Sequence, residues 1–250
     1  MDIETLANEA WKQYTSDETQ KLTCVIKDVI PILYFGDYEA YQKSPLKIIT
    51  AGLNPSGAEF PDGTLCRFPG FSKIPEGGTF SAEKYLQCLN EYFRKNPYNK
   101  WFSAYDEMLE GFDSSFKNGK TNTVLHTDLC SPFATDPTWS KLDDEKKIIL
   151  SKWGKQNWFN LLSILKPDII LVSAARIHIS DILKQTKGEM RRSIWQKGTT
   201  QIVPIAIEHE GKKSWLFFGR AAQTPFGLLS KEDKRAAGQT VKAFYEKHPR

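Results

Sequence analysis

The sequence has few cysteines and lacks the closely spaced pairs that hold metal ions. Four cysteines stand far apart among the 250 residues, and no C-x-x-C pair occurs: Cys24, Cys66, Cys88 and Cys130. This spacing argues against a zinc ribbon or an iron–sulfur knuckle. Scattered single thiols are typical of proteins in a reducing compartment. We therefore expect no metal or other cofactor.

A long hydrophobic run is also missing. No apolar stretch approaches the roughly 20 residues that a membrane-spanning helix needs. The start of the chain, MDIETLANEAWKQY, is acidic and typical of a helix rather than of a signal peptide. We expect a soluble intracellular protein, cytoplasmic or associated with the nucleoid, which is a monomer and does not bind membranes.

No strong excess of either charge is present, because the net charge is only +4. This value is compatible with a polyanionic partner, but many proteins without such a partner share it. Basic residues gather in the second half of the chain, including the adjacent pair Arg191 and Arg192. From charge alone, a solvated face explains this distribution more simply than nucleic-acid binding does.

Short apolar segments alternate with amphipathic ones, which predicts an α/β fold. Helices are expected over residues 83–94 and 141–165, and a last helix is expected to begin after an N-cap at Ser230. We predict a single domain over residues 1–250, a three-layer α/β/α sandwich whose mostly parallel sheet has four to five strands. Residues 1–45 are expected to be a helical extension packed on it. The predicted strands are residues 47–51, 123–127, 168–173, 201–207 and 214–218.

Three of these strands run into loops rich in proline and aromatic residues, where a plain connection would be short and polar. In open α/β sheets, ligands bind beyond the carboxyl ends of the strands. The three loops therefore predict a pocket at this edge of the sheet. Their sequences are AGLNPSGAEFPDGTLCRFPGF, TDLCSPFATDPTW and FFGRAAQTPFGLLS.

The first loop does not fit a nucleotide-phosphate site. Gly52 and Gly57 have the outer spacing of a P-loop, but Ala58 and Glu59 stand where lysine and a hydroxyl residue are needed, and Glu59 would repel phosphate. The dinucleotide fingerprint G-x-G-x-x-G is absent as well. Asn54, which precedes a proline, is explained equally well by a role in the local turn and by a role in a reaction.

The motif GLNPSG resembles the first motif of the uracil-DNA glycosylase superfamily, in the Asn-Pro form of its mismatch-specific and single-strand-selective branches. Further segments resemble later parts of that fold in order, although only the first match is specific: NPYNKWF, VLHTDLCSP, KPDIILVSAARI and FFGRAAQTPFGLLS. The resemblance implies an enzyme that flips a nucleotide out of DNA and hydrolyses its N-glycosidic bond.

By this resemblance, Asn54 holds the attacking water. Its neutral amide can orient the water but cannot act as a strong base. Gly52, Leu53 and Pro55 would shape the base pocket, and an aromatic ring there could stack on the flipped base. Loop packing is expected to explain at least two of the three candidate rings, Phe60, Phe68 and Phe71.

The last motif departs from the superfamily because it contains no histidine. Arg220 or Gln223 could instead contact the leaving base or a phosphate. The following segment, with Phe226, Leu228 and Leu229, could supply the apolar wedge that fills the space left by the flipped base. Core packing before the final helix explains these three residues about as well.

Asp128 is a second departure, because the uracil-specific branch carries asparagine at this strand end. An ionised aspartate only accepts hydrogen bonds, so it would repel O4 of uracil and pair with the exocyclic amine of cytosine. We therefore expect the excised base to be uracil-like or, as a further hypothesis from Asp128, a 5-modified cytosine, with a role in repair or in defence against phages. A turn or N-cap role for Asp128 has equal weight.

These motifs and the resemblance thus favour a monofunctional DNA glycosylase that acts on single- or double-stranded DNA. No lysine precedes Lys73 in the first loop, so a Schiff-base lyase has no evident nucleophile. Two alternatives stay open. One is a non-catalytic nucleic-acid binder on the same fold, and the other is a hydrolase acting on free nucleosides or nucleotides.

Overall fold

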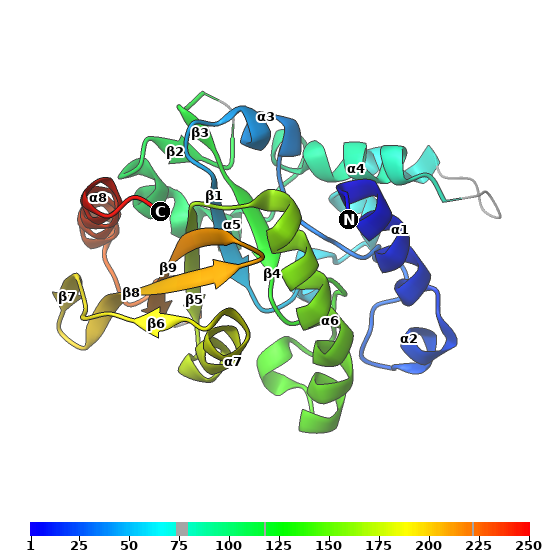
Figure 1. Cartoon of the computed structure of the whole chain (residues 1–250). Coiled ribbons are helices and arrows are strands. Elements are labelled where there is room, and N and C mark those ends of the chain that lie inside the picture. The colour runs from blue at the N-terminus through cyan, green and yellow to red at the C-terminus, as the bar shows by residue number, and fades with distance from the viewer. Residues whose placement is uncertain (74–79, 118, 222) are drawn as a thin grey trace. The chain divides into compact units, whose positions relative to one another are not determined.

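The computed structural model describes residues 1–73, 80–117, 119–221 and 223–250 (Figure 1). Its central mixed sheet is mostly parallel and is flanked by helices. The strand order is β4 (Leu125–Asp128), β1 (Ile48–Gly52), β5 (Ile169–Ala174), β9 (Lys212–Arg220), β8 (Thr200–His209) and β6 (Glu189–Met190), with β7 (Trp195–Lys197) also paired to β8.

The inner strands are apolar over their whole length because both of their faces are covered. Strand β5 pairs in parallel with β1 on one side and with β9 on the other, and every residue of β1 and β5 is buried. Strands β8 and β9 are antiparallel, and Glu210 and Gly211 between them both have positive φ, as a tight hairpin turn requires. The turn lies within the segment EHEGKK, residues 208–213.

The predicted α/β sandwich is confirmed, with differences at the edges of elements. The sheet has seven strands rather than four to five, because the short strands β6 and β7 join β8 through backbone hydrogen bonds. Both are largely exposed and polar, so no apolar pattern marks them. The predicted strand over residues 123–127 begins at Leu125, and Thr123 belongs to a separate pair, β2 (Ser114–Ser115) and β3 (Asn122–Thr123).

The predicted long helix and last helix are present. Ser230 caps the last helix by accepting a hydrogen bond from the Asp233 amide. The predicted helix over residues 83–94 ends as an α-helix at Asn90 and resumes as a 3-10 turn, Tyr92–Arg94. The helices are α1 (Ile3–Tyr14), α2 (Asp17–Lys21), α3 (Tyr38–Lys43), α4 (Ala82–Asn90), α5 (Asn99–Glu110), α6 (Asp144–Leu165), α7 (Arg176–Thr186) and α8 (Lys231–Lys247).

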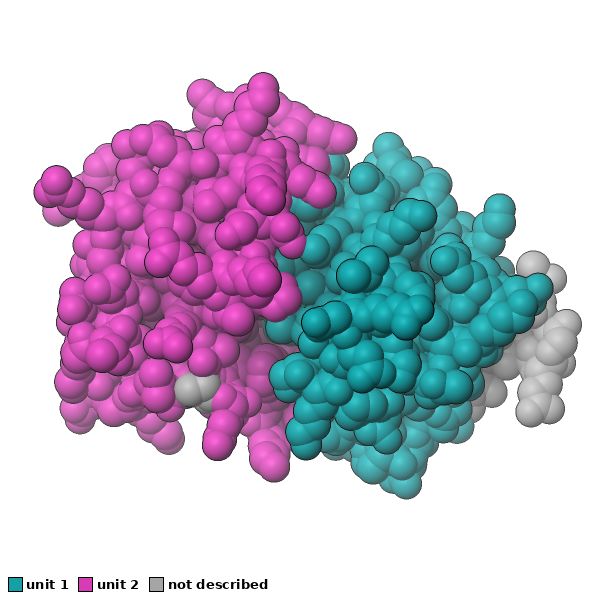
Figure 2. Space-filling view, turned by 90° about the horizontal axis from the view of Figure 1, so that it is seen from below, with its two compact units in different colours: residues 1–37, 52–97, 126–164 teal, residues 38–51, 98–125, 165–250 magenta. Residues whose placement is uncertain are grey.

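The chain divides into two compact units, which Figure 2 shows in different colours. Unit 1 comprises residues 1–37, 52–97 and 126–164, and unit 2 comprises residues 38–51, 98–125 and 165–250. The N-terminal helices α1 and α2 therefore belong to unit 1, together with the loop that follows β1.

Within unit 1, helix α6 holds the loop that follows β4. A Cβ atom on Gly154 would lie only 2.0 Å from the carbonyl oxygen of Cys130, so this contact needs glycine. The indole of Trp158 donates to the Thr127 hydroxyl at 3.0 Å. The rings of Trp153 and Phe133 are parallel, with centroids 5.6 Å apart. This loop is thus fixed by backbone contact, a hydrogen bond and ring stacking.

Within unit 2, helix α8, which is red in Figure 1, packs closely against helix α5. A Cβ atom on Gly238 would lie 2.2 Å from the Met108 carbonyl oxygen. The buried ammonium of Lys234 on α8 donates to the carbonyl oxygens of Ala104 and Pro225. Lys234 thereby connects the loop after β9 to these two helices. Burial of its ammonium lowers the pKa of Lys234.

Candidate active site

The loops that follow β1 and β4 lie side by side in unit 1. The carbonyl oxygen of Leu53 accepts hydrogen bonds from the amides of Cys130 and Ser131, at 2.8 and 3.2 Å. Further along, Thr135 donates its amide to Pro55 and accepts from the amide of Gly57. Two of the three loops predicted to form a pocket are therefore joined by backbone hydrogen bonds.

Three acceptors orient the side chain of Asn54 between these loops. Its amide nitrogen donates to the carbonyl oxygens of Pro55 and Phe133, at 2.8 and 3.3 Å, and to the hydroxyl oxygen of Thr135, at 2.8 Å. The Thr135 hydroxyl gives its own proton to the carbonyl oxygen of Pro137, so it can only accept from Asn54. The nitrogen side of the amide is fixed, and the oxygen side must face away from these groups.

Asn54 is half-buried, and no described residue donates a hydrogen bond to its Oδ1. An oriented amide oxygen with free lone pairs is an acceptor for a water molecule or for a substrate donor. The packing of α6 on the β4 loop therefore reaches Asn54 through Phe133, whose ring stacks on Trp153 of α6.

Asp128 ends β4 and faces the end of β1. Its side chain is buried, and its Oδ1 lies 3.7 Å from Nε2 of the buried His126. A Cβ atom on Gly52 would lie 2.6 Å from Oδ1 of Asp128 and 3.1 Å from Nε2 of His126. The absence of a side chain at position 52 thus leaves the space that the side chains of Asp128 and His126 occupy.

Glu59 is buried in the same unit, where the hydroxyl of Tyr92 donates to its Oε1. Burial raises the pKa of Glu59 to about 8, and the charge of Asp128 adds to this rise, while the Tyr92 hydrogen bond and Arg67 oppose it. At neutral pH Glu59 therefore carries a proton. The repulsion of phosphate expected from Glu59 does not apply, and the missing lysine and hydroxyl alone argue against a P-loop.

The three candidate stacking rings have different surroundings. Phe60 and Phe68 are buried, 3% and 1% exposed, and their rings stack on each other with centroids 6.2 Å apart. Phe71 is half-buried, and its ring centroid lies 6.0 Å from that of Trp11. Both buried rings thus take part in loop packing.

The predicted residues of the last motif all belong to unit 2. Arg220 and Gln223 are exposed, and Gln223 has a positive φ of 56°. Phe226 is buried: its amide donates to the Ser173 hydroxyl, and its ring fills the space that a side chain on Gly219 would take. Among the wedge candidates, Leu228 is 56% exposed, whereas Phe226 and Leu229 are 1% and 8% exposed.

Three residues of the site were not predicted: His126, Tyr92 and Thr135. One signal was available, because residues two apart on a strand face the same side, which places His126 beside Asp128. Tyr92 and Thr135 carry no local signal, since their partners Glu59 and Asn54 are 33 and 81 residues away.

Within the described part of the chain, no group of three or more histidine, cysteine, aspartate or glutamate side chains is arranged to hold a metal ion. The described helices also include none that is long and apolar enough to cross a membrane.

Comparison with known protein families and with curated proteins gives no match for this sequence. The features that bear on function are therefore the GLNPSG motif and the geometry around Asn54.

Proposed function

We propose that this protein is a monofunctional DNA glycosylase in which Asn54 holds the attacking water. The observation that carries the proposal is the orientation of the Asn54 amide, whose nitrogen donates to three acceptors while its oxygen accepts no hydrogen bond from any residue that the structure describes. The GLNPSG motif, which resembles that of the uracil-DNA glycosylase superfamily, stands at this position.

In the proposed reaction, the bond between C1′ of the sugar and the base nitrogen breaks, and both electrons leave with the base. The sugar gains oxocarbenium character, so a weakly activated water can attack C1′. The water forms the new C–O bond and releases a proton, while the anionic base takes one up. Asn54 needs only to aim the water, which suits a neutral amide.

Asp128 and Glu59 would distinguish the base. Asp128 accepts hydrogen bonds when ionised, and Glu59, protonated at neutral pH, keeps a proton that it can donate. An acceptor at this strand end favours the exocyclic amine of a cytosine-type base over O4 of uracil. Because Asp128 is only 6% exposed, a base could meet it only after leaving the DNA stack. We propose a 5-modified cytosine as the substrate, with a uracil-like base as the alternative.

The test is excision from DNA oligonucleotides that carry uracil, cytosine or 5-modified cytosines, with released bases identified by mass spectrometry. Release of a modified cytosine and an alkali-labile abasic site are expected. Asn54→Ala should reduce strand scission after alkali by about a hundredfold or more, since a preorganised polar contact to the reacting group is lost.

Asn8→Ala is the matched control, because Asn8 is exposed on α1 and bonds only within its own helix. The melting temperatures of both variants show whether a loss of activity comes from a loss of folding. The Asn54→Ala variant should still bind DNA nearly as well as the natural protein. Full activity of Asn54→Ala would contradict the proposed role. DNA binding without base release from any substrate would favour a non-catalytic binder, and release from free nucleosides alone would favour a nucleoside hydrolase.

A further inference from the structure

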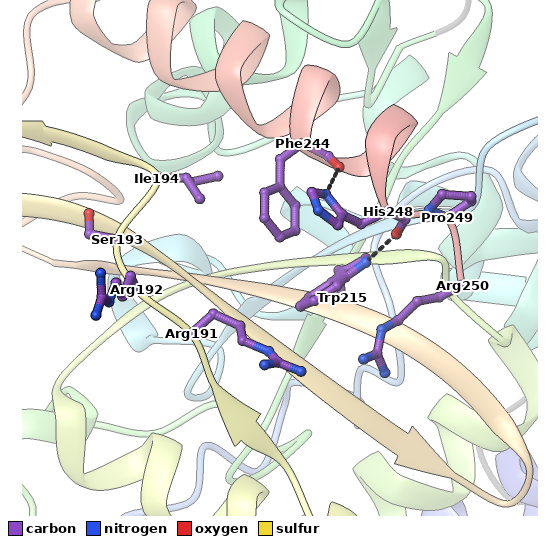
Figure 3. A pocket seen from close by; sticks show the side chains of 9 residues that line it. All are labelled: Arg191, Arg192, Ser193, Ile194, Trp215, Phe244, His248, Pro249 and Arg250. Atoms are coloured by element: carbon purple, nitrogen blue, oxygen red, sulfur yellow. Dashed lines mark hydrogen bonds between the residues drawn. The ribbon is translucent and has the colours of Figure 1, made fainter.

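Unit 2 contains a pocket of ≈ 700 Å³ that the glycosylase proposal does not use (Figure 3). Its volume lies within the range of about 300–1,000 Å³ that is usual for small-molecule sites. It is lined by Arg191, Arg192, Ser193, Ile194, Trp215, Phe244, His248, Pro249 and Arg250. These residues come from the segment between β6 and β7, from β9, and from the end of α8 and beyond.

Hydrogen bonds and ring contacts build one wall of the pocket from aromatic side chains. The indole nitrogen of Trp215 donates to the carbonyl oxygen of His248 at 2.7 Å, and Nδ1 of His248 lies 3.0 Å from the carbonyl oxygen of Phe244. The rings of Phe244 and His248 stack with centroids 4.4 Å apart, and Phe244 meets Trp215 edge to face. The wall is thus formed before any ligand binds.

The charged side chains that line the pocket are positive. Three arginines contribute to the lining and no acidic residue does, although Arg191 also pairs with the exposed Glu189 at 2.8 Å. An exposed ion pair of this kind is weak, so it leaves Arg191 able to bind another anion. The guanidinium of Arg250 lies 4.3 Å from the ring centre of Trp215. In Figure 3, Arg191 and Arg250 point into the same space beside Trp215.

A planar cation that rests on an indole presents its outer face as a stacking surface, and nucleobases stack on guanidinium planes as well as on aromatic rings. His248 is an exposed residue, and the face of its ring that does not stack on Phe244 offers a second such surface. Arginine also binds phosphate with two parallel hydrogen bonds. The pocket therefore combines binding groups for a flat ring and for an anion.

We propose that this pocket binds a nucleotide, with its phosphate held by Arg191 and Arg250 and its base stacked on Arg250 or His248. Inorganic phosphate would use the charge but would leave the aromatic wall and most of the volume unfilled. The proposal does not rest on the chemistry assigned to Asn54, so either can fail without the other.

The test is binding of four probes by calorimetry at low salt: a mononucleotide, its nucleoside, inorganic phosphate and a short single-stranded oligonucleotide. Saturable binding of one mononucleotide per chain is expected, at least about tenfold tighter than the nucleoside or phosphate, because each lacks one of the two contacts. If only the oligonucleotide binds, Arg191→Gln and Arg250→Gln should weaken its binding. In that case the ligand is a nucleotide within a nucleic-acid strand, which also supports the site.

Arg191→Gln and Arg250→Gln should each weaken nucleotide binding by about tenfold, since each removes a charge-assisted contact. Arg176→Gln is the control, because Arg176 is exposed in unit 2 and does not line the pocket. No saturable binding of the mononucleotide or the oligonucleotide would overturn the proposal. Equal binding of phosphate and nucleotide, or binding that both pocket variants leave unchanged, would overturn it too.

Discussion

At the scale of single residues, the candidate site depends on groups whose state is set by burial. Glu59 lies two residues after the GLNPSG motif, and its surroundings determine whether its carboxyl is protonated. Because burial favours the neutral form of the Glu59 carboxyl, Glu59 and Asp128 need not both be charged at neutral pH. The two buried carboxyls can therefore offer one hydrogen-bond donor and one acceptor.

This state predicts a specific dependence of stability on pH. An unperturbed Glu59 carboxyl titrates at 4.5, whereas in the folded protein it titrates at about 8. Between these values the folded state holds more protons than the unfolded state, so the Glu59 contribution to stability falls as pH rises, by about 1.4 kcal/mol per pH unit.

Glu59→Gln removes this titration and keeps an acceptor for Tyr92. The melting temperature of the variant, relative to that of the natural protein, should therefore rise from pH 5 to pH 8. A difference that stays constant over this range would show that Glu59 ionises normally in the folded state.

The space at Gly52 gives a second prediction at this scale. Gly52→Ala would place Cβ 2.6 Å from Oδ1 of Asp128, so we expect a loss of about 1–3 kcal/mol in the free energy of unfolding. In an Asp128→Ala background the same change should cost much less, because the closest clashing atom is gone. Denaturant unfolding of the four proteins in this double-mutant cycle measures the coupling, and equal costs in both backgrounds would contradict the proposed contact.

At the scale of elements, helix α6 and the β4 loop act as the support of Asn54. Gly154→Ala improves helix propensity by about 1 kcal/mol, but its Cβ would lie 2.0 Å from the Cys130 carbonyl oxygen. The clash should prevail, so we expect a lower melting temperature. The loop that carries Phe133 and Thr135 should also shift, with a loss of excision activity.

Gly238→Ala in helix α8 is the matched control for this change. It places a Cβ 2.2 Å from the Met108 carbonyl oxygen, so it should also lower the melting temperature, but it does not touch the contacts of Asn54. Excision is compared at a temperature at which both variants are folded. Equal activity of the two would show that α6 does not act through the β4 loop.

At the scale of the whole molecule, the sheet was predictable because its inner strands are continuous apolar runs between amphipathic helices. Strands β6 and β7 were not, because they are only two and three residues long and mostly exposed, so they carry no apolar run. The motif made Asn54 a candidate, but its partners could not be predicted, because Phe133 and Thr135 are distant in sequence. The pocket of unit 2 was missed for the same reason, as Trp215 and Arg250 carry no shared local pattern.

The order Asn54–Pro55 also affects the chemical stability of the Asn54 side chain. Asparagine loses its amide when the backbone nitrogen of the next residue attacks the side-chain carbonyl and forms a cyclic imide. That nitrogen must lose a proton, and the nitrogen of proline has none. Residue 54 is thereby protected from this route of spontaneous conversion to aspartate, whose carboxylate would meet the carbonyl oxygens of Pro55 and Phe133. The proline that shapes the turn also preserves the chemical identity of the side chain on which the proposed reaction depends.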